Sequence, residues 1–410
     1  MTKVAFSDEH LTYAACSDIG MKRAINQDSF DAQFSAIDEW SKRGHRFLVA
    51  DGMGAHAAGE LASQLAAEQV MEQYQRSDAE PRQAICDALE LANKHIFDRG
   101  QADPQLFNMG TTCSSLILLP AGALVGHVGD SRVYRCRDEL LQQLTFDHSL
   151  VWEMRAAGQL GSNGESANIP RNVITRCLGP HSDVDIDVEG FFSVRKGDTF
   201  LLCSDGLTGK VTDQEIGGIV RYLNPEVAVD FLVDLANLRG GSDNITVIVA
   251  RVVSDKLSAA GEVPEKIPRA ATGTHPAWWI LAGVGLVAAL LGIRFEQVPV
   301  IAIGGIAFCL GALGAALQWF RQRRHPQPTP NAIPTSPYVT APAVVDDTFF
   351  HGIKSTLEAM GTAFPELPIT PALESLQSVP KTDVGGFSNE SCIQICEQFA
   401  ELAKQLRDKI

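Results

Sequence analysis

The chain has 410 residues, more than a single small core usually accommodates, so two or more structural units are expected. Its 49 acidic residues outnumber its 34 basic residues, and the net charge of -15 argues against a nucleic-acid partner, because phosphate backbones require a basic surface. The acidic excess indicates an ordinary solvated surface or, in part, carboxylates gathered to hold cations. Nine scattered Cys residues without a CxxC pair, and an N-terminus without an apolar leader, predict a first domain with free thiols in the cytoplasm.

The first 255 residues alternate apolar runs, turns and amphipathic stretches, and we interpret 1–255 as one catalytic domain. Helices come in groups rather than after each strand, which favours an α+β fold of packed antiparallel sheets flanked by helices over repeated βαβ units. The predicted strands are 46–50, 112–119, 123–128, 132–137, 199–203 and 245–253. The predicted helices are 59–75, 81–99, 213–222 and 225–238.

Two charge-free apolar segments, 277–293 and 298–320, follow a polar linker at 256–276. A membrane-spanning helix needs roughly 20 apolar residues, so the second segment suffices and the first is near the lower limit. Aromatic residues stand at the outer ends of the pair, as at membrane interfaces. The segments therefore predict a transmembrane helical hairpin at 277–320, with a buried soluble helical pair as the alternative.

A Pro-rich linker is predicted at 321–345, and the segment 346–410 is expected to form helices near 346–360 and 388–409. Apolar residues in the second helix fall on one stripe. The stripe could bind a partner helix or pack within the chain, and we favour local packing. The role of 346–410 is not indicated by its sequence.

Three Asp residues stand next to predicted strands. Asp51 and Asp205 each end an apolar run and begin an Asp-Gly turn, and Asp243 shortly precedes the strand at 245–253. If the last strand is antiparallel to the other two, the three carboxylates meet at one edge of the sheets. Oxygen clusters of this kind suit Mg²⁺ or Mn²⁺ rather than Zn²⁺. A single Asp-Gly would indicate only a turn.

Two further residues could take part in a site at this cluster. Asp130 lies at the turn of an expected hairpin formed by 127–135, and on its own it is a turn residue. Arg23 would ordinarily be a solvated charge, but beside a metal cluster its guanidinium could hold a phosphoryl group through two hydrogen bonds.

The ordered motifs resemble the metal-dependent, type 2C serine/threonine protein phosphatases, and in particular bacterial, membrane-anchored members. The stretches that carry the resemblance span residues 17–252: SDIGMKRAINQDSF, FLVADGMGAHAAGE, MGTTCSSLIL, GHVGDSRVYRCR, LTFDHSLV, ITRCLGP, LLCSDGLTGKVTDQEI and GGSDNITVIVARV. The resemblance implies a central sandwich of two antiparallel β-sheets flanked by helices, with two Mn²⁺ or Mg²⁺ ions at one end.

The resemblance also implies a role for each matching residue. Asp51 would bridge both ions, the Gly52 carbonyl would bind one of them, and Asp205 and Asp243 would bind the other. Arg23 would bind the substrate phosphate. The two other acids have lesser implied roles: Asp28 would hold metal-bound water, and Asp130 would bind a weaker third ion.

The implied reaction is hydrolysis of phosphoserine or phosphothreonine on proteins by a metal-bridging hydroxide, without a covalent intermediate. Three positions depart from the family pattern: Gln27 replaces a frequent Glu, Met53 stands where animal members have His, and Gly209 replaces an Asp of the third metal site. The last departure leaves binding of a third ion undecided.

His56 and His148, the two His nearest the motifs, are expected to be structural, and 155–176 matches the variable flap near the substrate. The alternative to an active enzyme is a catalytically weak membrane sensor or scaffold, and the alternative enzyme is a metal-dependent hydrolase of another phosphate ester. The expected partners are phosphorylated proteins, an opposing kinase and membrane lipid. The expected location is the inner, cytoplasmic membrane, in a multi-pass arrangement with the catalytic domain in the cytoplasm.

Overall fold

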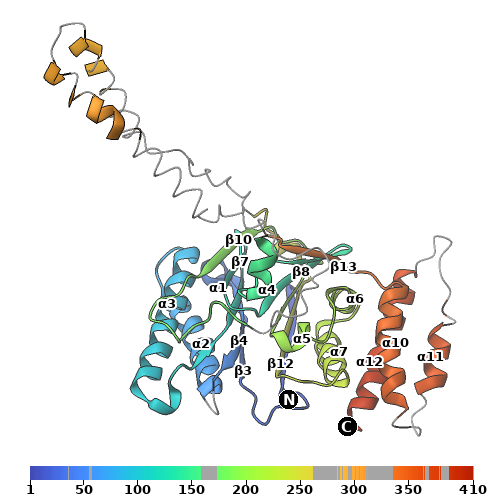
Figure 1. Cartoon of the computed structure of the whole chain (residues 1–410). Helices are drawn as coiled ribbons and strands as arrows, with labels where there is room; N and C mark the ends of the chain where they lie inside the picture. The colour runs from blue at the N-terminus through green and yellow to red at the C-terminus, as the bar shows by residue number, and fades with distance from the viewer. Residues whose placement is uncertain are drawn as a thin grey trace. The chain divides into compact units, whose positions relative to one another are not determined.

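A computed structural model describes residues 1–35, 37–54, 58–157, 173–261 and 336–409, the last with gaps at 363, 365–368, 378 and 380–386, together with scattered residues between 284 and 312. The chain divides into two compact units (Figure 1). One unit combines Met1–Val263 with Thr335–Ile410, and the other is Pro264–Pro334.

The first sheet of the larger unit has seven strands in the order β1-β2-β12-β11-β8-β9-β13. Each neighbouring pair is antiparallel. The strands are β1 (Thr2–Ser7), β2 (Leu11–Asp18), β8 (Arg132–Arg137), β9 (Leu140–Gln143), β11 (Thr199–Cys203), β12 (Ile245–Val252) and β13 (Val339–Pro342).

The second sheet has the order β10-β7-β6-β4-β3, with the short β5 beside β4, and its pairs are also antiparallel. Its strands are β3 (Asp28–Gln33), β4 (His45–Met53), β5 (Gly110–Thr111), β6 (Cys113–Leu119), β7 (Gly122–Val128) and β10 (Asp187–Phe192). The predicted pair of antiparallel sheets is therefore confirmed.

Alternation along β4 explains how the sheets stack. Phe47 and Val49 contribute to a core shared with the seven-stranded sheet, whereas Leu48 and Ala50 pack against α2 (Ala58–Arg76) and α3 (Pro81–Ala102). Successive side chains of a strand point to opposite faces, so a strand buried on both faces is apolar throughout.

Helices cover the outer faces of both sheets. On the seven-stranded sheet, α6 (Asp213–Tyr222) and α7 (Pro225–Leu238) pack in one core with the side chains of β11 and β12. The start of α6 has a capping box, in which Thr212 and Glu215 satisfy each other's backbone N–H groups. The shorter helices are α1 (Ile37–Arg43), α4 (Leu150–Ala156) and α5 (Asp205–Thr208), with 3-10 turns at Pro104–Leu106 and Asp255–Leu257.

The C-terminal helices belong to the same unit as the sheets. These are α10 (Asp347–Gly361), α11 (Ile369–Gln377) and α12 (Asn389–Arg407). The apolar stripe of α12, including Ile395 and Phe399, is buried in the core that also contains α6 and α7. The stripe packs within the chain, as we favoured. The segment expected to be a Pro-rich linker contains β13, which pairs with β9.

The expected hairpin around Asp130 is wrong. Strand β7 pairs with β6 and β10, whereas β8 pairs with β9 and β11, so Asp130 lies where the chain crosses from one sheet to the other. The chain crosses because β7 also pairs with β10, and β8 also pairs with β11, both of which come later in the sequence.

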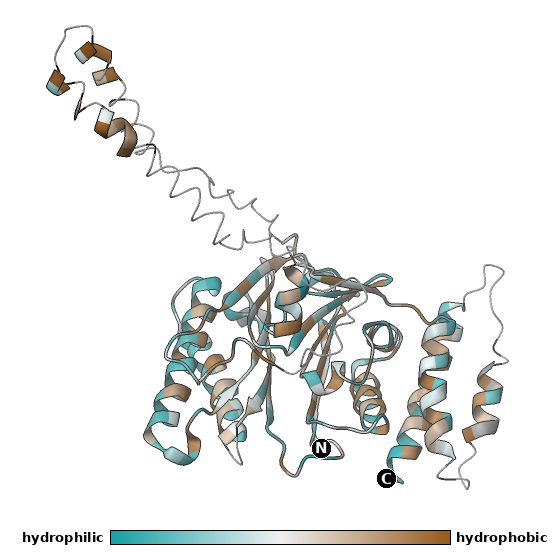
Figure 2. Cartoon of the chain, viewed as in Figure 1, coloured by the Kyte–Doolittle hydropathy of each residue, from teal (hydrophilic) through white to brown (hydrophobic). Residues whose placement is uncertain are grey.

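Most of the predicted membrane hairpin lies outside the described residues. Those that are described between 284 and 312 are helical and nearly all hydrophobic (Figure 2). In the part of the chain that the structure describes, none of the helices combines the length and the apolar character needed to cross a membrane.

Candidate active site

The predicted acidic residues come from both sheets and meet at one edge of the sandwich. Asp28 is the first residue of β3 and lies opposite Asp51 of β4. Asp205 begins α5 after β11, and Asp243 lies shortly before β12, the antiparallel neighbour of β11. Ser204 connects the two sheets, because its Oγ donates to Oδ2 of Asp28 at 2.7 Å.

Burial and mutual repulsion raise the pKa values of three of these carboxyl groups, those of Asp51, Asp28 and Asp205. Burial and then the charges of Asp28 and Asp205 raise the pKa of Asp51 well above its usual value. Burial raises the pKa of Asp28 to about 7, although the hydrogen bond from Ser204 favours the charged form. Burial and the neighbouring Asp243 raise the pKa of Asp205. Without cations, these carboxylates cannot easily all be charged.

Three carboxylate oxygens of this cluster are buried without a hydrogen-bond partner: Oδ1 of Asp28, Asp130 and Asp205. Among the described residues, His, Cys, Asp and Glu side chains do not form a complete metal-binding group of three or more. Mg²⁺ usually keeps several waters and takes one or two carboxylates, so it needs free oxygens rather than a closed cage. The oxygens present therefore fit hard divalent cations.

Glycine at position 52 is required by close backbone packing. A Cβ on Gly52 would lie 2.1 Å from the carbonyl oxygen of Gly59 in α2 and 2.5 Å from that of Gln27. The Gly52 N–H donates to the same Gln27 oxygen at 3.1 Å. This packing fixes the Asp51-Gly52 backbone beside the carboxylates.

Arg23 lies at the acidic cluster, where its Nη2 donates to Oδ2 of Asp243 at 2.8 Å. The side chains are 48% and 32% exposed, so both remain accessible to a ligand. Asn244 holds the loop that carries Arg23: its Nδ2 donates to the carbonyls of Ile19 and Ile25, at 2.9 and 3.0 Å. The structure thus brings Arg23 to the predicted site, paired with a predicted metal ligand.

Asp130 belongs to the same group of acids. Burial and, to a smaller extent, the charge of Asp205 together raise its pKa to about 7. The neighbouring Ser131 hydroxyl contacts Oγ1 of Thr112 at 2.7 Å, and the same Thr112 oxygen accepts from the Asp51 N–H at 2.9 Å. The crossing between the sheets is therefore tied to the backbone of β4.

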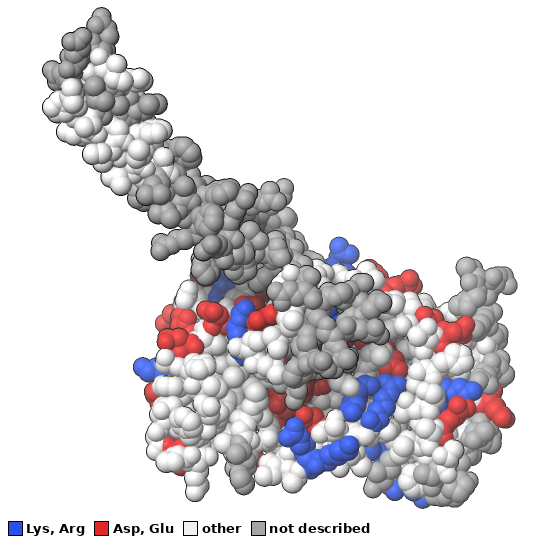
Figure 3. Space-filling view, viewed as in Figure 1, with Lys and Arg blue, Asp and Glu red and all other residues white. Residues whose placement is uncertain are grey.

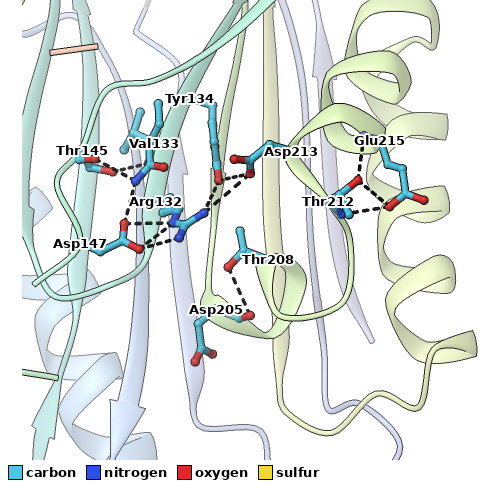
Figure 4. Close-up of polar contacts among 11 residues, drawn as sticks. Arg132, Val133, Tyr134, Thr145, Asp147, Asp205, Thr208, Thr212, Asp213 and Glu215 are labelled. Carbon is cyan, nitrogen blue, oxygen red and sulfur yellow. Dashed lines mark hydrogen bonds and ion pairs between the residues drawn. The ribbon is translucent and has the colours of Figure 1, made fainter. Parts of the chain in front are cut away.

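A largely buried cation, Arg132, lies beside α5 and the start of α6 (Figure 4). Arg132 donates to Asp147 at 2.6 Å and to the hydroxyl of Tyr134 at 2.9 Å, and it lies 3.7 Å from Asp213 at the start of α6. Its charge acts on Asp205 and lowers the pKa that burial raises. Acidic side chains gather at the centre of the face shown in Figure 3, with basic side chains beside them.

Of the two His residues, His148 is fully buried and structural. Its Nδ1 accepts from the Gly129 N–H at 3.0 Å, so Nε2 carries the proton and donates to Asp187 in β10. His56 lies outside the described residues, as does 158–172, the greater part of the expected flap.

Sequence reasoning missed three polar residues that hold the site: Ser204, Thr112 and Asn244. Each lies within a stretch that carries the family resemblance, and Asn244 directly follows Asp243 in GGSDN. A polar residue next to a strand-end carboxylate was the available signal, but such residues also occur in ordinary turns.

Comparison with known proteins identifies the family. A profile described as protein phosphatase 2C matches residues 21–238. The protein phosphatase PhpP of Streptococcus pneumoniae is 37% identical over 238 residues, covering 56% of this chain and 93% of PhpP. The serine/threonine protein phosphatase PstP of Mycobacterium tuberculosis is 38% identical over 255 residues, covering 59% of this chain and 45% of PstP.

Solved structures of serine/threonine phosphatases also match this chain. The crystal structure of the M. tuberculosis serine/threonine phosphatase PstP/Ppp has a TM-score of 0.53 and 32% identity, covering 60% of this chain and 100% of that chain. The catalytic domain of PstP with two manganese ions has a TM-score of 0.51 and 33% identity, covering 60% and 99%. Fold and similarity together define a serine/threonine protein phosphatase. The chain belongs to the protein phosphatase 2C family.

Proposed function

We propose that the protein hydrolyses phosphoserine and phosphothreonine on other proteins with two Mn²⁺ or Mg²⁺ ions bound at the acidic cluster. The observation that carries the proposal is the set of buried carboxylate oxygens without partners, next to the exposed Arg23. Divalent cations would remove the repulsion that raises the pKa values of these acids. The ions would supply neutralisation of phosphoryl charge and a lowered pKa of water.

Each residue has a distinct proposed role. Asp51 pairs with Asp28 across β3 and β4, and its side chain contacts that of Asp205. It would therefore contact both ions, with the Gly52 carbonyl on one. Asp205 and Asp243 would hold the other ion. Asp28, fixed by Ser204, would orient water.

Asp130 would hold a third ion only weakly. Position 209, from which a second carboxylate could reach such an ion, is Gly.

Arg23 would bind the substrate phosphoryl group. The planar guanidinium can donate two parallel hydrogen bonds to phosphoryl oxygens. Its ion pair with Asp243 is partly exposed, and such pairs contribute only about 0–1 kcal/mol. Arg23 can therefore exchange Asp243 for a substrate at little cost once a cation neutralises that carboxylate.

The proposal is tested by Mn²⁺-dependent release of phosphate from a phosphothreonine peptide. Asp51→Asn, Asp205→Asn and Asp243→Asn should each nearly abolish release while the circular dichroism spectrum stays native. A matched control is Asp230→Asn, a surface position that pairs with Lys3 away from the cluster. Wild-type turnover in two of the three site variants would reject the assigned site.

The same assay separates the alternatives. A scaffold that only binds partners would release no phosphate from the peptide at any Mn²⁺ concentration. A hydrolase of other phosphate esters would prefer nucleotide substrates. We expect the peptide to be the better substrate, which would leave an opposing serine/threonine kinase as the source of the physiological phosphoproteins.

We further propose that 277–320 tethers the enzyme to the cytoplasmic face of the inner membrane in a multi-pass arrangement. The apolar sequence supports this proposal, as do the large apolar side chains that the described residues of this segment expose. Val298 is 73% exposed, Ile303 69% and Val284 63%. Side chains of this kind are stable in contact with lipid.

A further inference from the structure

The C-terminal segment docks on α6 at two adjacent glycines. A Cβ on Gly218 would lie 2.5 Å from Cε2 of Phe349 in α10, and a Cβ on Gly217 would lie 2.9 Å from Cα of Ala343. Glycine weakens a helix relative to alanine, so two in succession within α6 need a structural reason. The reason here is close approach, and this surface of α6 is shaped to receive residues 335–410.

Arg239, at the C-terminal end of α7, joins this segment to α6. Nε donates to Oγ1 of Thr356 at 3.0 Å, and Nη2 donates to the carbonyl of Gly352 at 3.0 Å, both in α10. The two terminal nitrogens also donate to the two carboxylate oxygens of Glu215, each at 2.7 Å. The last donor, on Nη1, reaches the Lys210 carbonyl at 2.9 Å. All five N–H groups of the guanidinium are thus used.

Gly352 makes this arrangement possible. A Cβ at this position would lie 2.6 Å from Oε1 of Glu215, so only glycine lets α10 approach the Arg239–Glu215 pair so closely. Glu215 is itself buried and also closes the capping box of α6 with Thr212. The contact between α10 and the rest of the unit is therefore specific and polar as well as apolar.

The Arg239 contacts involve the chain segments next to two residues of the acidic cluster. Lys210, whose carbonyl Arg239 holds, follows the single turn of α5 that Asp205 begins, and the Gly209 N–H donates to the Asp205 carbonyl at 2.8 Å. In the other direction, the chain runs from Arg239 through Gly240 and Gly241 to Asp243. The Arg239 side chain thus holds the segment that follows Asp205, and its own backbone begins the segment that leads to Asp243.

A second contact ties α12 to the loop that carries Arg23. Arg407 lies 3.7 Å from Oδ1 of Asp18, which also accepts from the Gly20 N–H at 2.9 Å. Asn237 of α7 donates to the same oxygen at 3.0 Å. Gly20 in turn lies against Asp243, because a Cβ there would be 2.1 Å from the Asp243 carbonyl oxygen.

We propose that residues 335–410 are a positioning element of the metal site, and that Arg239 is the residue through which they position Asp205 and Asp243. This inference rests on the proposed function, because it concerns the cations bound there. The C-terminal helices do not touch substrate; they hold the ligand-bearing loops at the correct separation. Docking of these helices and binding of the cations are then linked, and each must strengthen the other.

The test measures Mn²⁺ binding by calorimetry on the full chain. Arg239→Lys keeps the charge but loses the fork of donors, and Gly352→Ala forces α10 away from Glu215. We expect both to bind Mn²⁺ at least tenfold more weakly than wild type, with activity recovering at high Mn²⁺. The control is Leu89→Ala in α3, a buried position on the opposite side of the sandwich. Its unfolding free energy should fall, but its Mn²⁺ affinity should not.

Several outcomes would overturn the proposal. Unchanged Mn²⁺ affinity in both variants, with only stability reduced, would make Arg239 a purely structural residue. Weakening by the same factor in Leu89→Ala would show a general effect of instability. If wild type itself binds no Mn²⁺, the proposed function fails, and this inference fails with it. If neither variant folds, hydrogen exchange in wild type decides: Mn²⁺ should slow exchange in α10, and unchanged exchange would contradict the coupling.

Discussion

Arg23 donates a hydrogen bond to Asp243 across 220 positions of sequence, at 2.8 Å. The pair joins the residue proposed to bind phosphate to a residue proposed to bind a cation. Its two members must therefore separate, or change partners, when the site is filled. Arg23 and the proposed cation would compete for one carboxylate.

Replacing Arg23 by Ala should change substrate and metal binding in opposite directions. Loss of a charged hydrogen bond to phosphate should raise KM about tenfold, with a smaller effect on kcat. Loss of the competing cation should tighten Mn²⁺ binding by about twofold to fivefold, the range expected of a partly exposed ion pair. Steady-state kinetics and calorimetry measure the two effects. An unchanged KM would contradict the role of Arg23, and weaker Mn²⁺ binding would contradict the competition.

The metal-free protein should lose stability as the pH rises. The pKa of Asp28 is about 7 in the folded protein, and that of Asp130 is also about 7, against about 3.9 for an unfolded chain. Between these values the folded state binds more protons than the unfolded state, so the free energy of unfolding falls with increasing pH. In EDTA, Tm should be higher at about pH 5.5 than at about pH 7.5.

Saturating Mn²⁺ should reverse this order, because the ion requires deprotonated carboxylates. Asp28→Asn supplies the control, since it removes one of the two titrating groups and should flatten the dependence measured in EDTA. A metal-free Tm that rises over the same interval would show that these acids are not protonated in the folded protein.

Gly209→Asp should create tighter binding of a third ion. Gly209 has φ -70° and ψ -13°, an ordinary helical conformation, and its Cβ would meet the Asp205 carbonyl at 3.1 Å. A side chain at this position can therefore be accommodated with a small adjustment. Calorimetry should reveal a strengthened weak Mn²⁺ site with the two tight sites unchanged. Gly209→Ala controls for the added Cβ, and equal weak-site isotherms for the Asp and Ala variants would reject the prediction.

The strands that the sequence predicts are those with long apolar runs, such as β6, β11 and β12. The sequence did not reveal β2, although it is buried, because its alanines and Thr12 have little local hydrophobic signal. The edge strand β3 was also missed, because only Phe30 and Ala32 among its six residues are apolar. The chain crossing at Asp130 depends on pairing with distant strands, and a local pattern cannot distinguish it from a hairpin.

Asp51, Asp205 and Asp243 were predictable because each stands next to a local signal, an Asp-Gly turn or the start of a strand. The roles of Asp28 and Asp130 followed only from the family resemblance. Arg239 had no such signal. Its partners Lys210, Glu215 and Gly352 lie between 24 and 113 positions away from it in the sequence. Similarly, the sequence shows Gly218 only as a residue that weakens a helix. Its role is seen only in the structure, where Phe349 packs against it. Contacts between distant parts of the chain decide which glycines and charges matter.

The last prediction concerns membrane topology. Arg321, Arg323 and Arg324 follow the second apolar segment, and Lys266 and Arg269 precede the first. Basic residues near membrane segments are retained in the cytoplasm, so both flanks should be cytoplasmic and the short connection around Glu296 external. This topology lets residues 335–410 meet the sheets from the same side of the membrane, as their shared compact unit requires.

Labelling of single cysteines with an impermeant maleimide in intact cells tests this topology. Six native cysteines are buried, so replacing Cys86, Cys177 and Cys309 by Ser should leave little labelling of native thiols. A Cys introduced at Glu296 should react in intact cells, whereas one at the exposed Glu390 of α12 should react only after lysis. If only 298–320 spans the membrane, Glu390→Cys would react in intact cells. That result would also place α12 and α7 on opposite sides of the membrane, contradicting the packing of Phe399 in their common core.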